Sequence, residues 1–271
     1  MVNNSVVMKN FLKFIFILLT RTNNSFAEDD EKALKISTDA YNYDKGFGDF
    51  TSSSTMTLRN KQGEESIRYF RGKTLEVDGD GDKTLFIFDS PRDVKGTATL
   101  TFTHKYDPDD TWLYLPALKR VKRITSDNRS GSFVGSEFAY EDLGSQELEK
   151  YKDRKYLKKE PCPKKEELSC HVISRVPTEK SSGYKYQVLW LDDTNAHKIW
   201  KIDYYDRKGS HLKTLFFGGY KVYNEKHWRP ANYKMINHQT GKSTDLLVEN
   251  IQFKVGLSPR DFNNKTLSRA R

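Results

Sequence analysis

The sequence predicts a mainly β protein with a few helices, in which one long, curved antiparallel sheet forms a single domain. Two observations carry this prediction. Apolar and polar residues alternate in many short segments rich in β-branched and aromatic side chains, and turns of a few residues separate these segments. Such short connections join antiparallel neighbours, because parallel strands need long crossovers. With 271 residues, 36% hydrophobic and 13% aromatic, the chain is also long enough to bury a core.

Period-two segments follow one another along most of the chain. Turn sequences at residues 60–63, 78–81, 206–209 and 239–242 separate several of them. No internal repeat and no Pro- or Ser-rich linker divides the chain, so residues 28–271 are expected to form one domain. The predicted strands are Thr55–Arg59, Ser66–Phe70, Lys73–Val77, Thr84–Phe88, Thr97–Thr103, Thr111–Leu115, Lys119–Thr125, Tyr184–Leu191, Lys198–Tyr205, His211–Phe217, Tyr220–Tyr223, Ala231–Asn237 and Thr244–Phe253.

Two segments favour helices. In Glu28–Tyr41, Ala33, Ile36 and Ala40 recur at helical spacing behind an acidic first turn, which suits a helix N-terminus. Phe138–Tyr151 is the second candidate, although Gly144 weakens it.

The N-terminal residues 1–27 are typical of a cleavable secretory signal. Lys9 and Lys13 supply positive charge, and Lys13 interrupts the apolar run at residues 11–20, which is too short to span a bilayer. Ser25-Phe26-Ala27 has the small-x-small pattern of a cleavage site. The alternative is an uncleaved N-terminal anchor. We expect cleavage after Ala27 and export to the periplasm, which would lower the formal net charge from +9 to +6.

The chain contains two cysteines, Cys162 and Cys170, between segments with strand character. In an oxidising compartment a pair this close is most simply a disulfide, and closing the loop would stabilise the fold by about 2.5 kcal/mol. Two free thiols, or a metal site that includes His171, are the alternatives. A fourth ligand at a suitable spacing is missing for the metal site.

Sequence motifs for catalysis and for cofactors are missing. The six histidines are scattered, and no nucleophile elbow, zinc-protease motif or phosphate-binding glycine loop occurs, so we expect neither an enzyme nor a bound cofactor. A hydrolase assembled from distant residues stays an open alternative. Asp78, Asp80, Asp82 and Asp89 have calcium-loop spacing, but Lys83 stands where the loop needs Gly. Whether this acidic turn binds calcium is left open, and a plain turn is favoured.

The densest positive cluster consists of Lys119, Arg120, Lys122 and Arg123. Its simplest interpretation is a solvated strand. Export argues against a nucleic-acid partner, whereas anionic headgroups or an acidic partner surface would attract each Lys or Arg with roughly 1 kcal/mol.

Aromatic and branched residues at alternate positions place one side of several strands against an apolar environment. A packed core is the common explanation. The competing hypothesis is a concave surface that receives a ligand, and two helices are few to cover so many apolar strand faces. Within Lys198–Tyr205, alternation predicts Trp200, Ile202 and Tyr204 on one face. The candidate ligand-binding residues are Phe86, Phe88, Leu100, Phe102, Trp112, Tyr114, Val188, Trp190, Trp200 and Phe216.

Four stretches resemble the outer-membrane lipoprotein-sorting family, the relatives of the carrier LolA. They are residues 90–100 (SPRDVKGTATL), 107–124 (DPDDTWLYLPALKRVKRI), 131–143 (GSFVGSEFAYEDL) and 203–209 (DYYDRKG). The resemblance extends from about residue 50 to Leu267. Val134 and Glu137 depart from it, where Met and Asp are expected.

This resemblance implies a half-open β-barrel, one antiparallel sheet curled around helices that plug its mouth. It also implies a soluble, monomeric periplasmic carrier whose apolar hollow holds acyl chains of lipids or lipoproteins. The motifs are most similar to those of carriers that accompany inner-membrane exporters of the RND or MMPL type. An accessory subunit of an export complex, with a packed interior and no ligand, is the alternative. The segments Glu28–Tyr41 and Phe138–Tyr151 are the expected cover of the hollow.

Overall fold

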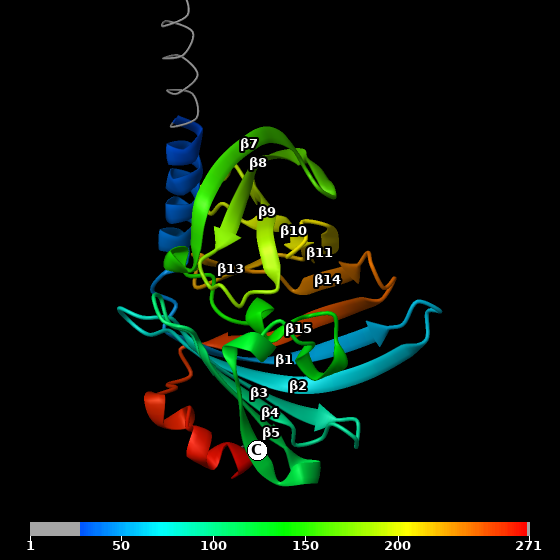
Figure 1. The fold of residues 1–271 in the computed structure, drawn as a ribbon. Coiled ribbons are helices and arrows are strands. Elements are labelled where there is room, and N and C mark those ends of the chain that lie inside the picture. Colours follow the sequence, from blue (N-terminus) through cyan, green and yellow to red (C-terminus); the bar gives the residue numbers. More distant parts are fainter. Residues whose placement is uncertain (1–27, 270–271) are drawn as a thin grey trace, which may run out of the picture.

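One thirteen-stranded antiparallel sheet dominates the computed structural model, which describes residues 28–269 (Figure 1). The predicted signal sequence lies outside the described residues. The sheet strands are β1 (Asp49–Arg59), β2 (Glu65–Leu75), β3 (Lys83–Ser90), β4 (Ala98–Phe102), β5 (Asp110–Leu115), β6 (Arg120–Ile124), β7 (Tyr151–Cys162), β8 (Lys165–Pro177), β9 (Tyr184–Asp192), β10 (Ile199–Asp206), β11 (His211–Gly218), β14 (Asn232–Asn237) and β15 (Ser243–Phe253).

The remaining elements are short, except for the N-terminal helix. Residues 28–44 are α-helical, and β12 (Lys221–Tyr223) and β13 (His227–Arg229) form a separate hairpin. The 3₁₀ turns are η1 (Pro116–Leu118), η2 (Ser126–Asn128), η3 (Phe133–Gly135), η4 (Tyr140–Asp142), η5 (Leu148–Lys150), η6 (Pro259–Asp261) and η7 (Asn264–Arg269). No helix within residues 28–269 has both the length and the apolar character that crossing a bilayer requires.

The chain starts in the middle of the sheet and builds it outward in both directions. Strands β1 to β6 proceed to one edge, residues 125–150 cross over, and β7 to β15 return from the other edge. The two halves join where β1 pairs with β15, with Ser54 opposite Val248. The edge strands β6 and β7 do not pair with each other, so the sheet stays an open barrel, as the LolA-like fold class predicts.

Most predicted strands are present, with small shifts of their ends. The segments predicted separately as Ser66–Phe70 and Lys73–Val77 form one strand, β2, that runs through Gly72. A Cβ at position 72 would lie 2.7 Å from the Ser52 hydroxyl oxygen and 3.2 Å from the Phe86 ring. Gly72 therefore permits close packing within a continuous strand and does not mark a turn.

The predicted disulfide is present. Cys162, at the end of β7, bonds to Cys170 on β8, and the Cα atoms lie 4.9 Å apart. The bond closes the end of the β7–β8 hairpin. Both cysteines are buried, and they pack with Val172 and Trp190.

The N-terminal helix is confirmed and extends to residue 44. It lies beside β7 and β8 (Figure 1), and the Lys32 ammonium lies 3.6 Å from the Tyr156 ring centroid on β7. Ala33 and Ile36 are buried in the main hydrophobic cluster, as their helical spacing predicts.

The prediction of a second helix over Phe138–Tyr151 is wrong. Residues 125–150 form an irregular segment with isolated 3₁₀ turns that crosses the concave face of the sheet; we call it the crossing segment (Figure 1). Tertiary contacts override the local helical pattern here. The Phe133 amide donates a hydrogen bond to the Phe138 carbonyl. The Asp142 carboxylate accepts hydrogen bonds from the Lys213 ammonium and the Tyr184 hydroxyl, each at 2.7 Å.

Phe133 anchors the crossing segment in the core. It is completely buried, and its ring centroid lies 5.7 Å from that of Phe88 and 6.0 Å from that of Phe86. Phe133→Ala is expected to lower the free energy of unfolding by about 3–5 kcal/mol, because it leaves a cavity among these rings. Denaturant unfolding measures this change. Tyr106→Ala, at a ring that is 84% exposed, is the control and should stay within about 0.5 kcal/mol. A loss below 1 kcal/mol at Phe133 would contradict a structural role for the segment.

Candidate functional site

The predicted ligand-binding residues fall into three groups. Phe86 and Phe88 point toward the concave side of the sheet, where they join the main cluster with Phe70, Phe133 and the N-terminal helix. Their strand neighbours Leu85 and Ile87 lie on the opposite face, in a second cluster. The alternation that the sequence predicts for β3 is therefore present.

Leu100, Phe102, Trp112 and Tyr114 belong to that second cluster, on the opposite face of the sheet. The C-terminal residues cover them: Phe262 and Leu267 are buried against β3 to β5, and η7 packs on β4 to β6 (Figure 1). These four residues serve as a structural core under the C-terminal tail.

Val188 and Trp190 face away from the concave side at the other end of the sheet, beside the disulfide. Trp200 packs with them, whereas Ile202 and Tyr204 lie in the main cluster. The prediction that Trp200, Ile202 and Tyr204 share a face is therefore wrong. A β-bulge between Ile199 and Lys201 shifts the β9–β10 register, so Trp200 lies on the face opposite to Ile202.

Phe216, the last of the ten predicted residues, alternates with Leu215 and Phe217, which belong to the main cluster. Its ring contacts the Lys164 ammonium, 4.3 Å from the ring centroid. This contact lies on the side of the sheet opposite to the main cluster.

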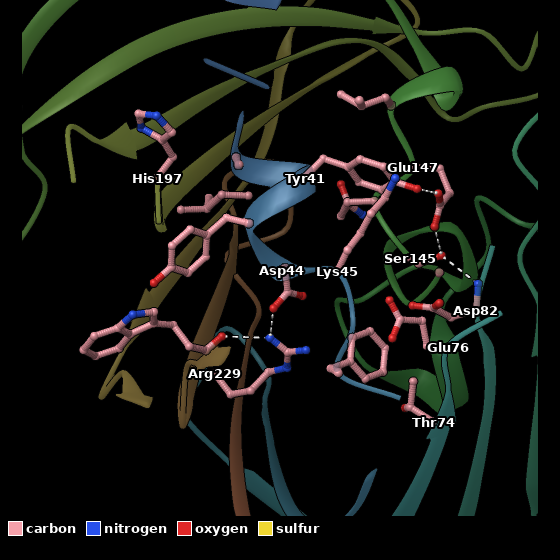
Figure 2. Close-up of a pocket in the computed structure, with 18 of the residues that line it drawn as sticks. Tyr41, Asp44, Lys45, Thr74, Glu76, Asp82, Ser145, Glu147, His197 and Arg229 are labelled. Carbon is pink, nitrogen blue, oxygen red and sulfur yellow. Dashed lines mark hydrogen bonds and ion pairs between the residues drawn. The ribbon is translucent and has the colours of Figure 1, made fainter. Parts of the chain in front are cut away.

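A cavity of about 780 Å³ lies between the C-terminal end of the N-terminal helix, the crossing segment and the concave face of the sheet (Figure 2). None of the ten predicted residues lines it. Its apolar wall includes Ala40, Leu143, Leu189, Leu191, Ile199, Phe217 and Tyr233. A polar wall adjoins it and includes Glu76, Asp82, Glu147, Arg154 and Arg175. Sequence alternation could not identify the apolar residues, because they come from a helix, a loop and four strands.

Two polar contacts hold the helix end against the cavity wall (Figure 2). The Tyr41 hydroxyl donates to Glu147 Oε2 at 2.6 Å, and Arg229 Nη1 pairs with Asp44 Oδ1 at 2.5 Å. Glu76 holds the residues that follow the helix, since its carboxylate accepts hydrogen bonds from the amides of Gly46 and Gly48, each at 2.7 Å. The helix end thus closes one side of the cavity through polar contacts.

Burial, together with the charges of Glu147 and Glu76, raises the pKa of Asp82 to about 7. The Asp82 amide donates to the Ser145 hydroxyl, which in turn donates to Glu147 Oε1 at 2.8 Å. Burial and the same Glu147 raise the pKa of Tyr41, so its hydroxyl keeps its proton. The cavity therefore contains the Asp82 carboxyl, whose pKa lies near neutral pH. Its charge acts on Tyr41, the residue that holds the helix end through Glu147.

The basic residues Lys119, Arg120, Lys122 and Arg123 lie on and just before the edge strand β6, with their side chains exposed. Arg123 pairs with Asp110. Within the described part of the chain, Lys119, Arg120 and Lys122 form no ion pair. Leu118 projects beside them and is 63% exposed.

Two of the four aspartates with calcium-loop spacing, Asp80 and Asp89, are engaged in separate contacts. Asp80 accepts from His104 at 2.8 Å, and Asp89 forms a bidentate pair with Arg71. Among residues 28–269, no three His, Cys, Asp or Glu side chains form a group that could hold a metal ion.

Comparison with solved structures identifies the family. A crystal structure of an outer membrane lipoprotein-sorting protein domain from Vibrio parahaemolyticus is 50% identical to this chain, with a TM-score of 0.85, and the match covers 89% of this chain and 100% of that one. The chain belongs to the outer-membrane lipoprotein-sorting family. The sequence motifs therefore identified the family correctly.

Two further solved structures share the fold of this chain. A DUF1329 family protein from Desulfovibrio piger ATCC 29098 is 26% identical, with a TM-score of 0.82 and coverage of 88% of this chain and 99% of that one. A LolA superfamily protein from Nitrosomonas europaea shares the fold at 17% identity and a TM-score of 0.68, over 85% and 97% of the two chains. Residues 80–269 match a family described as "Uncharacterized protein". No curated protein matches the chain.

Asp82 gives this lipoprotein-sorting protein a pH-dependent stability that can be measured. Because the folded-state pKa of about 7 exceeds the ordinary value of 3.8, the folded protein binds the extra proton between these values. Its Tm should therefore fall as the pH rises from about 4 to about 7. Asp82→Asn should remove this part of the slope and raise the Tm at pH 8.

Thermal unfolding between pH 4 and pH 8 tests this expectation. Asp78→Asn is the matched control, because Asp78 is exposed in the same turn. Parallel curves for the wild type and Asp82→Asn would show that this carboxyl does not titrate as expected.

Proposed function

We propose that the protein is a periplasmic carrier that shelters acyl chains of lipids or lipoproteins in its cavity and carries them toward the outer membrane. The observation that supports this proposal is the cavity of about 780 Å³ on the concave face, a volume in the usual range of small-molecule sites. Membership of the lipoprotein-sorting family supports the same activity.

The physical need for a carrier is large. Each buried methylene group gains about 0.8 kcal/mol, so an acyl chain of about fifteen carbons exposed to water costs on the order of 12 kcal/mol. A chain that lies along Leu189, Leu191 and Phe217 avoids this cost. The N-terminal helix and the crossing segment are the proposed cover, because an uncovered apolar hollow would favour aggregation.

The predicted signal at residues 1–27, with cleavage after Ala27, supports a periplasmic location. The disulfide fits the same compartment, since the periplasm keeps such bonds oxidised. From the motif resemblance we also propose that the carrier works with an inner-membrane exporter of the RND or MMPL type. The accessory-subunit hypothesis differs in one respect: it requires no ligand in the cavity.

Filling the cavity distinguishes these two functions. Ile199 lines the cavity and is half-buried, so Ile199→Trp should fold while it reduces the free volume. Displacing about two methylene groups of a ligand costs roughly 1.6 kcal/mol, which corresponds to more than a tenfold loss of affinity. Fluorescence titration with N-phenyl-1-naphthylamine, an uncharged apolar probe, measures the change. Native mass spectrometry of the wild type from its own periplasm should show bound lipid.

Ile67→Trp is the matched control, because it makes the same substitution at an exposed position outside the cavity. It should bind the probe like the wild type. If wild type, Ile199→Trp and Ile67→Trp all fail to bind the probe, the carrier proposal is wrong and the accessory role is favoured.

We further propose that the basic segment meets anionic headgroups when the carrier approaches a membrane. Removing three unpaired charges with Lys119→Gln, Arg120→Gln and Lys122→Gln should weaken binding to phosphatidylglycerol-containing vesicles by about a hundredfold at low salt, since each charge contributes roughly 1 kcal/mol. Co-sedimentation with vesicles measures binding.

The control for the basic segment carries the same net charge. It replaces Lys61, Lys208 and Lys242, all exposed on other turns, with Gln. Equal losses for the two triple variants would show that net charge alone, and not this segment, attracts the membrane.

A further inference from the structure

Arg175 is a buried cation in the polar wall of the cavity. It lies on β8, and only 8% of its surface is exposed. Its Nε donates to Gln187 Oε1 at 2.9 Å and one Nη donates to Gln146 Oε1, while the guanidinium stacks on the Tyr151 ring at 3.5 Å from the centroid. All of these partners are neutral.

Arg154 brings a second guanidinium to the same wall. A β-bulge between Lys152 and Lys155 inserts it into the β7 edge, and such bulges redirect a side chain. Its Nη atoms donate to the carbonyls of Tyr151 at 2.8 Å and Leu148 at 2.5 Å. Its Nε is buried and has no partner among the described residues.

Neither guanidinium forms an ion pair within the described residues. The charges of Tyr151 and Glu149 raise the pKa of Arg154, but Glu149 forms no salt bridge with it. Burial lowers the pKa of both arginines, and the charge of Arg175 lowers that of Arg154 further. Glu147 lines the same cavity, but its carboxylate accepts from Tyr41 and Ser145 and not from either arginine.

Two other buried cations of this protein form ion pairs with acidic side chains. Arg129 pairs with Asp109 and Glu179, and Lys213 pairs with Asp142. Arg68 resembles Arg154 in having unpartnered nitrogen atoms, but it does not line the cavity. A buried charge without a counter-ion is costly, and a planar guanidinium is well suited to bind carboxylate or phosphate oxygens.

We infer that Arg154 and Arg175 form a binding subsite for the anionic head of an amphiphile whose acyl chain occupies the apolar wall of the cavity. This inference rests on the proposed carrier function and specifies its cargo. The head is a carboxylate or a phosphate. An acyl chain attached through a neutral ester or amide would leave the two guanidiniums uncompensated.

The test uses the mature protein at pH 8 and competition against N-phenyl-1-naphthylamine. The competitors are hexadecanoate, its methyl ester, 1-hexadecanoyl-lysophosphatidylglycerol and inorganic phosphate. Wild type should bind at least one anionic amphiphile about tenfold more tightly than the methyl ester. Arg154→Gln and Arg175→Gln should each remove most of this preference and leave the affinity for the methyl ester unchanged.

Arg71→Gln is the control, since Arg71 is exposed and pairs with Asp89 outside the cavity. It should keep the full preference. Arg154 is less buried than Arg175, so Arg154→Gln still tests the subsite if Arg175→Gln does not fold.

Each other outcome has a distinct meaning. If the methyl ester binds as tightly as both anionic amphiphiles, the carrier proposal survives and the anionic subsite is wrong. If inorganic phosphate displaces the probe as well as the amphiphiles do, the site binds free anions and the inference is overturned. If neither the probe nor any amphiphile binds, the carrier proposal itself fails.

Discussion

The structure depends on one constraint: the two edge strands of the sheet do not meet. A closed barrel covers its interior by pairing its first and last strands, but here β6 and β7 lie at opposite ends of the strand order. The concave apolar face must therefore be covered by other parts of the chain or by a ligand. The N-terminal helix and the crossing segment supply part of this cover, and the cavity is the volume that they leave.

The same constraint explains why polar groups gather at the cavity. The helix end and the crossing segment are loops and helix termini with free backbone groups, and these need partners when they are buried. Glu76 satisfies the amides of Gly46 and Gly48, and Glu147 holds Tyr41. These polar contacts satisfy the groups at the rim of the cavity, while Ile36 and Phe133 anchor the cover in the apolar core.

Much of the fold could be predicted from the sequence, because period-two alternation and turn residues are local signals. The disulfide, the first helix and the family motifs were also readable. The second helix was not, because contacts to distant residues such as Lys213 decide the conformation of residues 138–151. The cavity residues were missed for a similar reason. Alternation shows which residues share a face of a strand, but not which face is concave or what covers it.

The aromatic residues around Trp112 illustrate this limit. Their strong alternation reflects a real apolar face, yet the cover is the C-terminal tail, whose contribution rests on Phe262 and Leu267. Two apolar residues in a polar stretch give no periodic signal. The bulge that moves Trp200 is equally invisible, since an extra residue in one strand changes the pairing without changing the composition.

Both open edges of the sheet are rich in positive charge, and this has a consequence for self-association. An exposed edge strand offers unpaired backbone groups to a second copy of the chain, and lysines along the edge oppose such pairing. The positively charged residues along these edges are Arg120, Lys122 and Arg123 on β6, and Lys152, Lys155, Lys158 and Lys159 on β7, which also carries the acids Asp153 and Glu160. Like charges would face each other in any edge-to-edge dimer or fibre. The sheet can therefore stay open without polymerising through its two edges.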